Sequence, residues 1–178
     1  MPNPTTPSPC RRASAAVATL LLALSFAAPA HADKGPRLPA VVPKAYTQEC
    51  GSCHVAYPPG LLPARSWQRL MTGLGTHYGS DASLDDAATV QQLSQWLQAN
   101  AGSSRKVRSE PPQDRITRAE WFVRKHRGVD AAVWAHVSVK SAANCAACHP
   151  QAEHGDFDEH GLRTPPGLDA RLTRGWRH

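Results

Sequence analysis

The pattern Cys-x-x-Cys-His occurs twice in this chain of 178 residues, at positions 50–54 and 145–149. Two cysteines three positions apart lie on one side of a single helical turn, so both sulfurs can reach the two vinyl groups along one edge of a porphyrin. The histidine that follows then lies beneath the ring, where its nitrogen can ligate the iron. This is the attachment signature of c-type haem, and its repetition predicts two covalently bound haem c groups.

A structural zinc site is the alternative interpretation, because two Cys-x-x-Cys pairs could supply the four thiolates of one tetrahedral site. Two features favour haem: a histidine directly follows each pair, and the chain begins with the pattern of an export signal. The predicted attachment residues are Cys50, Cys53, Cys145 and Cys148, and the predicted proximal iron ligands are His54 and His149.

The first 32 residues have the pattern of a secretory signal peptide. Arg11 and Arg12 form a basic flank, residues 13–28 form an apolar run, and an Ala-His-Ala sequence ends at Ala32. The run is shorter than the roughly 18–20 residues that a membrane span needs, which favours cleavage after Ala32 over an uncleaved anchor. We therefore predict a periplasmic protein with no membrane span in the mature chain.

Cleavage at this point would account for every cysteine. Of the five cysteines, Cys10 lies in the predicted signal peptide, and the other four belong to the two motifs. The predicted mature chain has no thiol left for a disulfide, a catalytic nucleophile or a cysteine axial ligand. The formal net charge is +6, and haem propionates would lower it, so the charge gives no support for nucleic-acid binding.

Helical periodicity predicts an all-α fold of short helices joined by long irregular loops. The apolar residues at 67, 70, 71 and 74 share one helix face, and Gly73 is expected to end that helix. Ser83 is expected to cap the next helix, and Thr117 with Glu120 has the spacing of a capping box for a later one. No convincing strand pattern and no Rossmann or P-loop motif occurs.

A polar segment separates two parts of the chain that contain one haem motif each. Residues 103–114 mix Ser, Arg, Lys and Glu with two prolines, which is typical of a linker. We predict a signal peptide over 1–32, an N-terminal haem lobe over 33–101, a linker over 102–114 and a C-terminal haem lobe over 115–178. Two haems would fill much of so short a chain, so folding is expected to depend on them.

The ligand opposite each motif histidine decides between an electron carrier and an enzyme, because an open iron can bind a substrate and a closed one cannot. His77 follows the apolar helix face and lies 23 residues after His54. His126 shares a helix face with Phe122 and lies 23 residues before His149. We expect His77 and His126 to be the distal ligands. The alternatives that remain open are His136, His160 and Met71.

Several segments resemble the bacterial dihaem cytochrome c family. They are residues 49–54 (ECGSCH), 57–63 (YPPGLLP), 82–85 (ASLD), 121–126 (WFVRKH) and 140–145 (KSAANC). The resemblance covers most of the predicted mature chain and implies a two-lobed periplasmic protein with two bis-histidine haems. It also implies that His77 and His126 are distal ligands. The implied role is electron transfer between a membrane cytochrome b and a small oxygen-binding monohaem cytochrome.

Two classes of function are compatible with the sequence. One is an electron carrier in which both irons are closed by protein ligands. The other is a dihaem redox enzyme, peroxidase-like or reducing a small oxyanion, in which one iron is open. The short chain and the lack of a spare cysteine favour the carrier. We therefore predict an electron-transfer protein without enzymatic activity.

Overall fold

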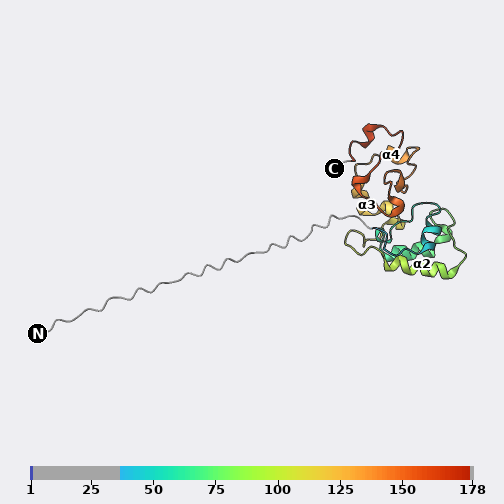
Figure 1. Ribbon diagram of the computed structural model, residues 1–178. Helices are drawn as coiled ribbons and strands as arrows, with labels where there is room; N and C mark the ends of the chain where they lie inside the picture. The colour runs from blue at the N-terminus through green and yellow to red at the C-terminus, as the bar shows by residue number, and fades with distance from the viewer. Residues whose placement is uncertain (2–36, 177–178) are drawn as a thin grey trace. The chain divides into compact units, whose positions relative to one another are not determined.

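The computed structural model describes Met1 and residues 37–176, a range that includes both Cys-x-x-Cys-His motifs. The predicted signal peptide lies outside the described residues except for Met1, so its cleavage stays a prediction. Among residues 37–176, all the regular secondary structure is helical and no strand forms (Figure 1). The predicted all-α fold is confirmed.

Four α-helices form within residues 37–176, together with shorter helical turns. The α-helices are α1 (Ala64–Thr72), α2 (Ala87–Ala99), α3 (Glu120–Lys125) and α4 (Ala131–Ala135). The haem motifs begin in η1 (Tyr46–Cys50), a π-helical turn, and in η6 (Cys145–Ala147), a 3-10 turn. The other 3-10 turns are η2 (Pro59–Leu61), η3 (Leu74–Thr76), η4 (Pro112–Asp114), η5 (Ile116–Arg118), η7 (Ala152–His154), η8 (Glu159–Gly161) and η9 (Ala170–Thr173).

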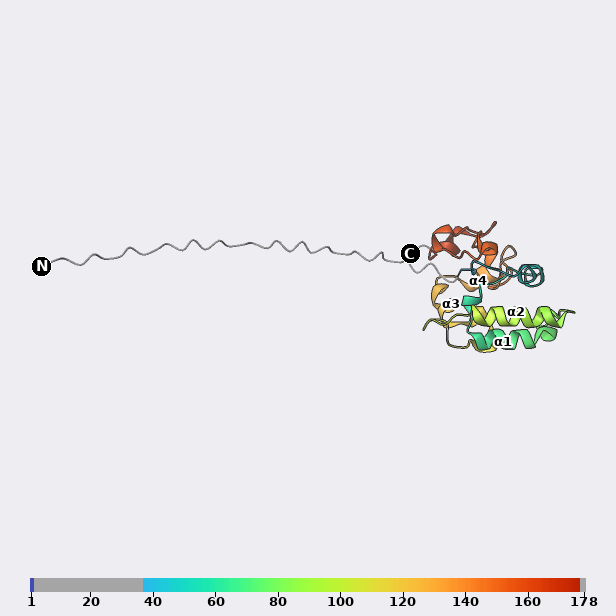
Figure 2. The ribbon, with the colours of Figure 1, turned by 60° about the horizontal axis from the view of Figure 1, so that its bottom comes forward.

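Helices α1 and α2 lie side by side and build the largest apolar core (Figure 2). Trp67 and Met71 of α1 are 7% exposed, and they belong to one cluster with Leu93 and Leu97 of α2, which are 0% and 1% exposed. Full burial of side chains of this size contributes about 1.5–3 kcal/mol each. Because Met71 serves this core, its position argues against the open alternative that it ligates an iron.

The cap of α2 is Asp86 and not the predicted Ser83. The Asp86 carboxylate accepts hydrogen bonds from the backbone N–H groups of Ala88 and Thr89, at 3.1 and 3.0 Å. Ser83 lies earlier in the loop, three residues before the cap. The prediction placed the helix start too early, because any of several Ser and Asp residues in this stretch could cap and only the fold selects one.

The predicted capping box at the start of α3 is also wrong. Thr117 already lies inside η5, and the N-cap residue of α3 is Ala119, which forms no side-chain capping hydrogen bond. The helix therefore starts at Glu120 after an extended residue. A 3-10 turn directly before the helix leaves Thr117 too far upstream to receive the N–H groups of the first helical turn.

The predicted linker, residues 102–114, contacts the N-terminal part of the chain. The N–H group of Gly102 donates to the carbonyl oxygen of Leu62 at 2.8 Å. A β-carbon at Gly102 would lie 2.5 Å from the carbonyl oxygen of Gly60, so only glycine permits this approach. Val107 is also buried. The lobe boundaries stay predictions, but the segment between them is packed.

Residues beyond 115 bury a separate and smaller set of side chains. Val133, Val139 and Ala152 are fully enclosed, and Phe122 of α3 is nearly so. The helices here are short and most of the chain is turns, as the sequence predicted. Little apolar packing holds this part together in the protein chain alone, which agrees with a fold that depends on haem.

Candidate haem-binding sites

His54 and His77 lie close together beside the first motif. Their ring centroids are 6.3 Å apart and their planes are inclined by 27°. His54 ends the motif, whereas His77 directly follows η3 after α1 has been terminated at Gly73. The chain therefore packs α1 against the core, turns, and returns a second imidazole to the first motif.

The second motif is paired in the same way with a histidine that precedes it. The ring centroids of His126 and His149 are also 6.3 Å apart, with their planes inclined by 73°. His126 is the C-cap residue of α3. One helical turn earlier, Phe122 stacks on it with a centroid distance of 3.9 Å and an angle of 21°. The shared helix face predicted for these two residues is confirmed.

The spacing of both pairs fits one metal ion held between two imidazoles. A ligating nitrogen lies about 2 Å from its metal and about 1.1 Å from its own ring centroid, so two opposed imidazoles have centroids about 6.2 Å apart. Both pairs are at 6.3 Å. The two predicted distal histidines are thus brought to the two motif histidines. The open alternatives lie elsewhere: Nδ1 of His136 accepts from the backbone N–H group of Ser138 at 3.3 Å, which places its proton on Nε2, and His160 is exposed.

Backbone carbonyl groups fix one ring in each pair. Nδ1 of His54 lies 2.8 Å from the carbonyl oxygen of Val55, and Nδ1 of His126 lies 2.9 Å from that of Phe122. A carbonyl oxygen only accepts, so Nδ1 must carry the proton, which leaves the Nε2 lone pair free for a metal. Nδ1 of His77 and of His149 is buried and finds no partner among the residues that the structure describes.

Burial favours the neutral form of three of these imidazoles, those of His77, His126 and His149, and the neutral form is the one that ligates a metal. Burial lowers the pKa of His149 to about 4, and the nearby His126 adds to this effect. Burial also lowers the pKa of His126 and, together with His54, that of His77. Two positive rings at this separation would repel each other, which adds to the lowering of the pKa of His77 and of His149.

No disulfide joins the four motif cysteines, so all four sulfurs are available for the predicted thioether bonds to haem. Burial raises the pKa of both Cys50 and Cys145 to about 11, so neither would act as a thiolate before haem is attached. Among residues 37–176, no cluster of three or more His, Cys, Asp or Glu side chains could hold a metal ion. The two cysteine pairs are therefore not gathered into the tetrahedral site that the zinc interpretation needs.

Tyr57 is a site residue that the sequence did not single out. Its ring stacks on His54, with centroids 4.8 Å apart and an angle of 22°. Its hydroxyl group donates to the carbonyl oxygen of Ala143, two residues before Cys145, at 2.6 Å. The only sequence signal for Tyr57 is that it begins the segment 57–63, one of those that resemble the dihaem cytochrome c family.

The chain is similar to known cytochromes with two haem groups. The family model for dihaem cytochrome c matches residues 46–157. A diheme cytochrome c from Shewanella baltica OS155 is 35% identical with a TM-score of 0.60, over 71% of this chain and 97% of that chain. DHC purified from Rhodobacter sphaeroides is 44% identical (TM-score 0.56, 66% and 98% covered). A diheme cytochrome c from the same organism is 41% identical (TM-score 0.59, 68% and 99% covered). A comparison with curated proteins gives no match.

The helical fold with its two motifs and these matches define a c-type cytochrome with two haem groups. The chain belongs to the dihaem cytochrome c family. The two predicted haem c cofactors are thereby confirmed, and the protein is a haem-based electron-transfer cytochrome.

Proposed function

We propose that this cytochrome transfers electrons through two bis-histidine haem sites and catalyses no bond chemistry of its own. The first haem site consists of Cys50, Cys53, the proximal ligand His54 and the distal ligand His77. The second haem site consists of Cys145, Cys148, the proximal ligand His149 and the distal ligand His126. The observation that carries the proposal is the 6.3 Å separation of the imidazole rings in both pairs.

Haem iron supplies one-electron redox chemistry when it is bound. The protein's residues attach and orient the group, and the histidines occupy both axial positions so that a substrate has no place to coordinate. The carbonyl groups of Val55 and Phe122 hold two of the imidazoles in the tautomer that ligates. The ligand type also favours a lower potential than histidine with methionine would give, because a thioether stabilises ferrous iron.

We further propose that the chain is exported to the periplasm after cleavage behind Ala32. There it would carry electrons between a membrane cytochrome b and a small oxygen-binding monohaem cytochrome. Family membership and the signal-peptide pattern support this role. No helix within residues 37–176 is long and apolar enough to cross a bilayer. The proposed lobes are residues 33–101 and 115–178, joined by 102–114.

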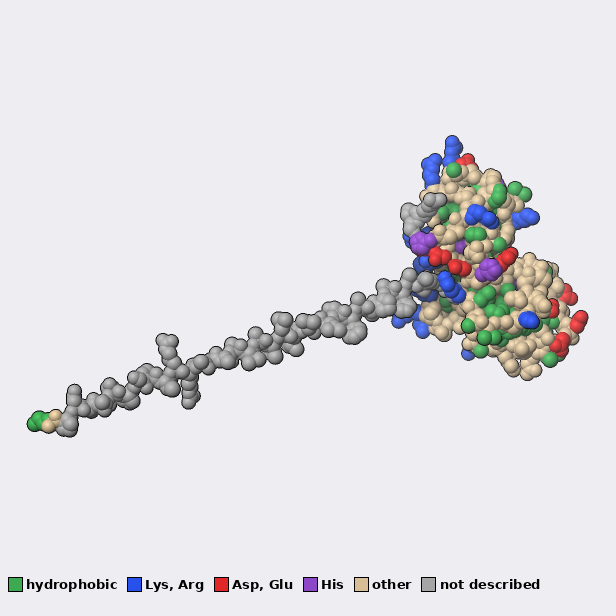
Figure 3. Space-filling model, in the orientation of Figure 1, with side chains coloured by type: hydrophobic (Ala, Val, Ile, Leu, Met, Phe, Trp, Pro, Cys, Tyr) green, Lys and Arg blue, Asp and Glu red, His purple; other side chains and the backbone are tan. Residues whose placement is uncertain are grey.

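We expect electrostatic attraction to make a modest contribution to the encounter with redox partners. Lys and Arg side chains are spread over the face drawn in Figure 3 and are not gathered in a single patch. Arg124 and Lys125 of α3 lie beside His126, and Lys125 pairs with Glu159 at 3.3 Å. Exposed charges of this kind act mainly on the rate of encounter, so oxidation by a partner cytochrome should slow as ionic strength rises.

Axial ligation is tested with the haem-loaded protein. The ferric form should be low-spin and lack the far-red charge-transfer band of methionine ligation. His77→Ala and His126→Ala should each convert one haem to an open site. His136→Ala is the matched control and should leave both haems low-spin, since His136 bonds Ser138. The assignment is wrong if either of the first two variants keeps two low-spin haems.

Function is tested separately by access of small ligands to the iron. The reduced native protein should bind carbon monoxide poorly and show little peroxidase turnover. Rapid stoichiometric binding to one haem, with matching turnover of peroxide or a small oxyanion, would instead establish the dihaem enzyme.

A further inference from the structure

The ring of His77 lies between those of His54 and Tyr78, with centroid distances of 6.3 and 4.7 Å. Its Nδ1 is buried but has no hydrogen-bond partner among the described residues. A cavity of about 180 Å³ lies against it, lined also by Arg69, Gly73, Tyr78 and Asp114. Among the described residues, the contact of His77 with its neighbour Tyr78 is therefore one that could set the position of the ring.

The next residue, Tyr78, ties this turn to a distant segment. The single proton of its hydroxyl group is shared between the carbonyl oxygens of Gln113 and Asp114, at O···O distances of 3.1 and 3.0 Å. The guanidinium carbon of Arg115 lies 4.0 Å from the centre of its ring, in the geometry of a cation–π contact. The Tyr78 ring also lies 4.7 Å from that of His77. Three consecutive residues, 113–115, thus hold the residue that follows His77.

Tyr78 and two of the residues that hold it adopt backbone conformations that are rare for residues with a side chain. The φ angles of Tyr78, Gln113 and Asp114 are 51°, 58° and 54°, in the left-handed region. Residues with a side chain other than Asn and Asp rarely adopt this region, because the β-carbon then lies too close to the following carbonyl oxygen. Such conformations persist only where surrounding contacts impose them.

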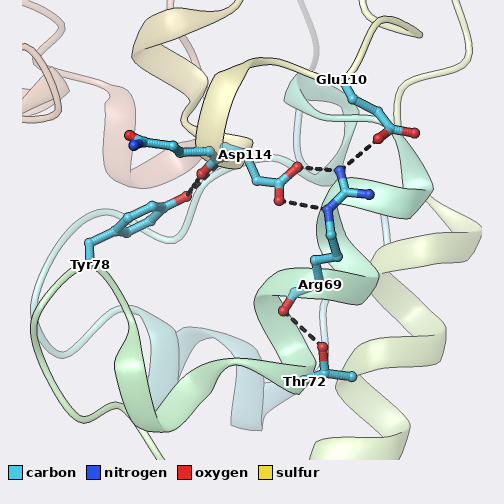
Figure 4. A network of polar contacts seen from close by, with 6 residues as sticks. Arg69, Thr72, Tyr78, Glu110 and Asp114 are labelled. Carbon is cyan, nitrogen blue, oxygen red and sulfur yellow. Dashed lines mark hydrogen bonds and ion pairs between the residues drawn. The ribbon is translucent and has the colours of Figure 1, made fainter.

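Arg69 of α1 supplies the contact that imposes this conformation. Its Nε and Nη2 atoms donate to the two carboxylate oxygens of Asp114 at 2.8 and 2.6 Å, and Nη2 also donates to Glu110 at 2.8 Å (Figure 4). The side chain of Asp114 is only 13% exposed. A two-bond pair of this kind fixes direction as well as distance, which an ordinary surface ion pair does not.

We propose that Arg69, Asp114 and Tyr78 form a clamp that positions His77 as the axial ligand of the first haem site. The proposal rests on the proposed role of His77. The path runs from the rigid helix α1 through Asp114 to Tyr78 and so to the neighbouring His77. The second haem site uses another device, since the Phe122 ring and carbonyl hold His126 directly.

The clamp is tested by Tyr78→Phe, which keeps the ring and removes only the two hydrogen bonds to the carbonyl oxygens. Asp114→Asn removes the charge that Arg69 holds. In the haem-loaded protein, each variant should change the first-site electron paramagnetic resonance signal. Each should also speed carbon monoxide binding at that site about fivefold, as expected for the loss of a typical hydrogen bond. The first-site signal is identified as the one that His77→Ala abolishes.

A matched control separates positioning from charge and from general destabilisation. Arg65→Met removes a positive charge from the preceding turn of α1 but touches none of the clamp contacts, so both haem signals should stay as in the native protein. The clamp is refuted if Tyr78→Phe and Asp114→Asn match the native protein, or if they disturb the two haem sites equally. If His77→Ala itself leaves both haems low-spin, the assignment of His77 fails, which is a different result.

Discussion

The hydroxyl group of Tyr57 donates a 2.6 Å hydrogen bond to the carbonyl oxygen of Ala143, which lies 86 positions later in the chain. The same tyrosine ring stacks on His54. Ala143 lies two residues before Cys145, so one side chain contacts the first haem site and the backbone that leads into the second. Tyr57 therefore links the histidine of the first motif to the backbone just before the second motif.

Tyr57→Phe should destabilise the haem-loaded protein by about 1 kcal/mol, because it removes one hydrogen bond and keeps the stack on His54. Tyr57→Leu should cost more, since the aromatic stack is lost as well. Chemical denaturation followed by haem absorbance measures both effects. An unfolding midpoint of Tyr57→Phe equal to that of the native protein would show that the bond to Ala143 contributes no stability.

The two haem sites should give different electron paramagnetic resonance signals in the ferric state. The imidazole planes are inclined by 27° in the first pair and by 73° in the second. Nearly parallel planes donate into the same iron d orbital, whereas nearly perpendicular planes donate into two different ones and leave the orbitals closer in energy. We expect the larger maximum g-value from the second site, and His126→Ala should abolish that signal. Two identical signals would contradict the observed angles.

Export and covalent loading have a direct readout in intact mass. The periplasmic product should have the mass of residues 33–178 plus two haem groups, and the haems should remain after denaturation because thioether bonds hold them. Cys148→Ala should weaken covalent attachment at the second site only. A product that retains residues 1–32 would contradict cleavage after Ala32.

Asp86→Ala should lower the stability of the protein by about 1 kcal/mol through loss of the α2 cap. Asp86→Asn retains one of the two oxygens that accept from Ala88 and Thr89, so it should keep one of these bonds and lose less stability. Ser83→Ala serves as the control, because Ser83 does not cap the helix. Thermal unfolding of the three variants compares these effects. A larger loss in Ser83→Ala than in Asp86→Ala would contradict the observed cap.

Sequence reasoning worked best where a residue's role depends on near neighbours in the chain. The helix through Trp67 and Met71 and its end at Gly73 were predicted from spacing alone and are confirmed. The caps predicted at Ser83 and Thr117 are wrong, although Ser and Thr are both residue types that commonly cap helices. Several residues in those stretches could cap, and the choice depends on where the packed helix begins.

The sequence by itself determined the chemistry of this protein, because haem attachment needs two cysteines and a histidine at fixed local spacing. It also pointed to His77 and His126, through the helices that precede or carry them. Only the tertiary structure showed that the ring centroid of each of these lies 6.3 Å from that of its motif histidine. Only the tertiary structure revealed the hydrogen bonds of Tyr57 to Ala143 and of Arg69 to Asp114. The partners lie 86 and 45 positions apart in the chain, so they leave no local sequence pattern. Such contacts exist only after the chain has packed, because they join a side chain to a segment far away in the sequence.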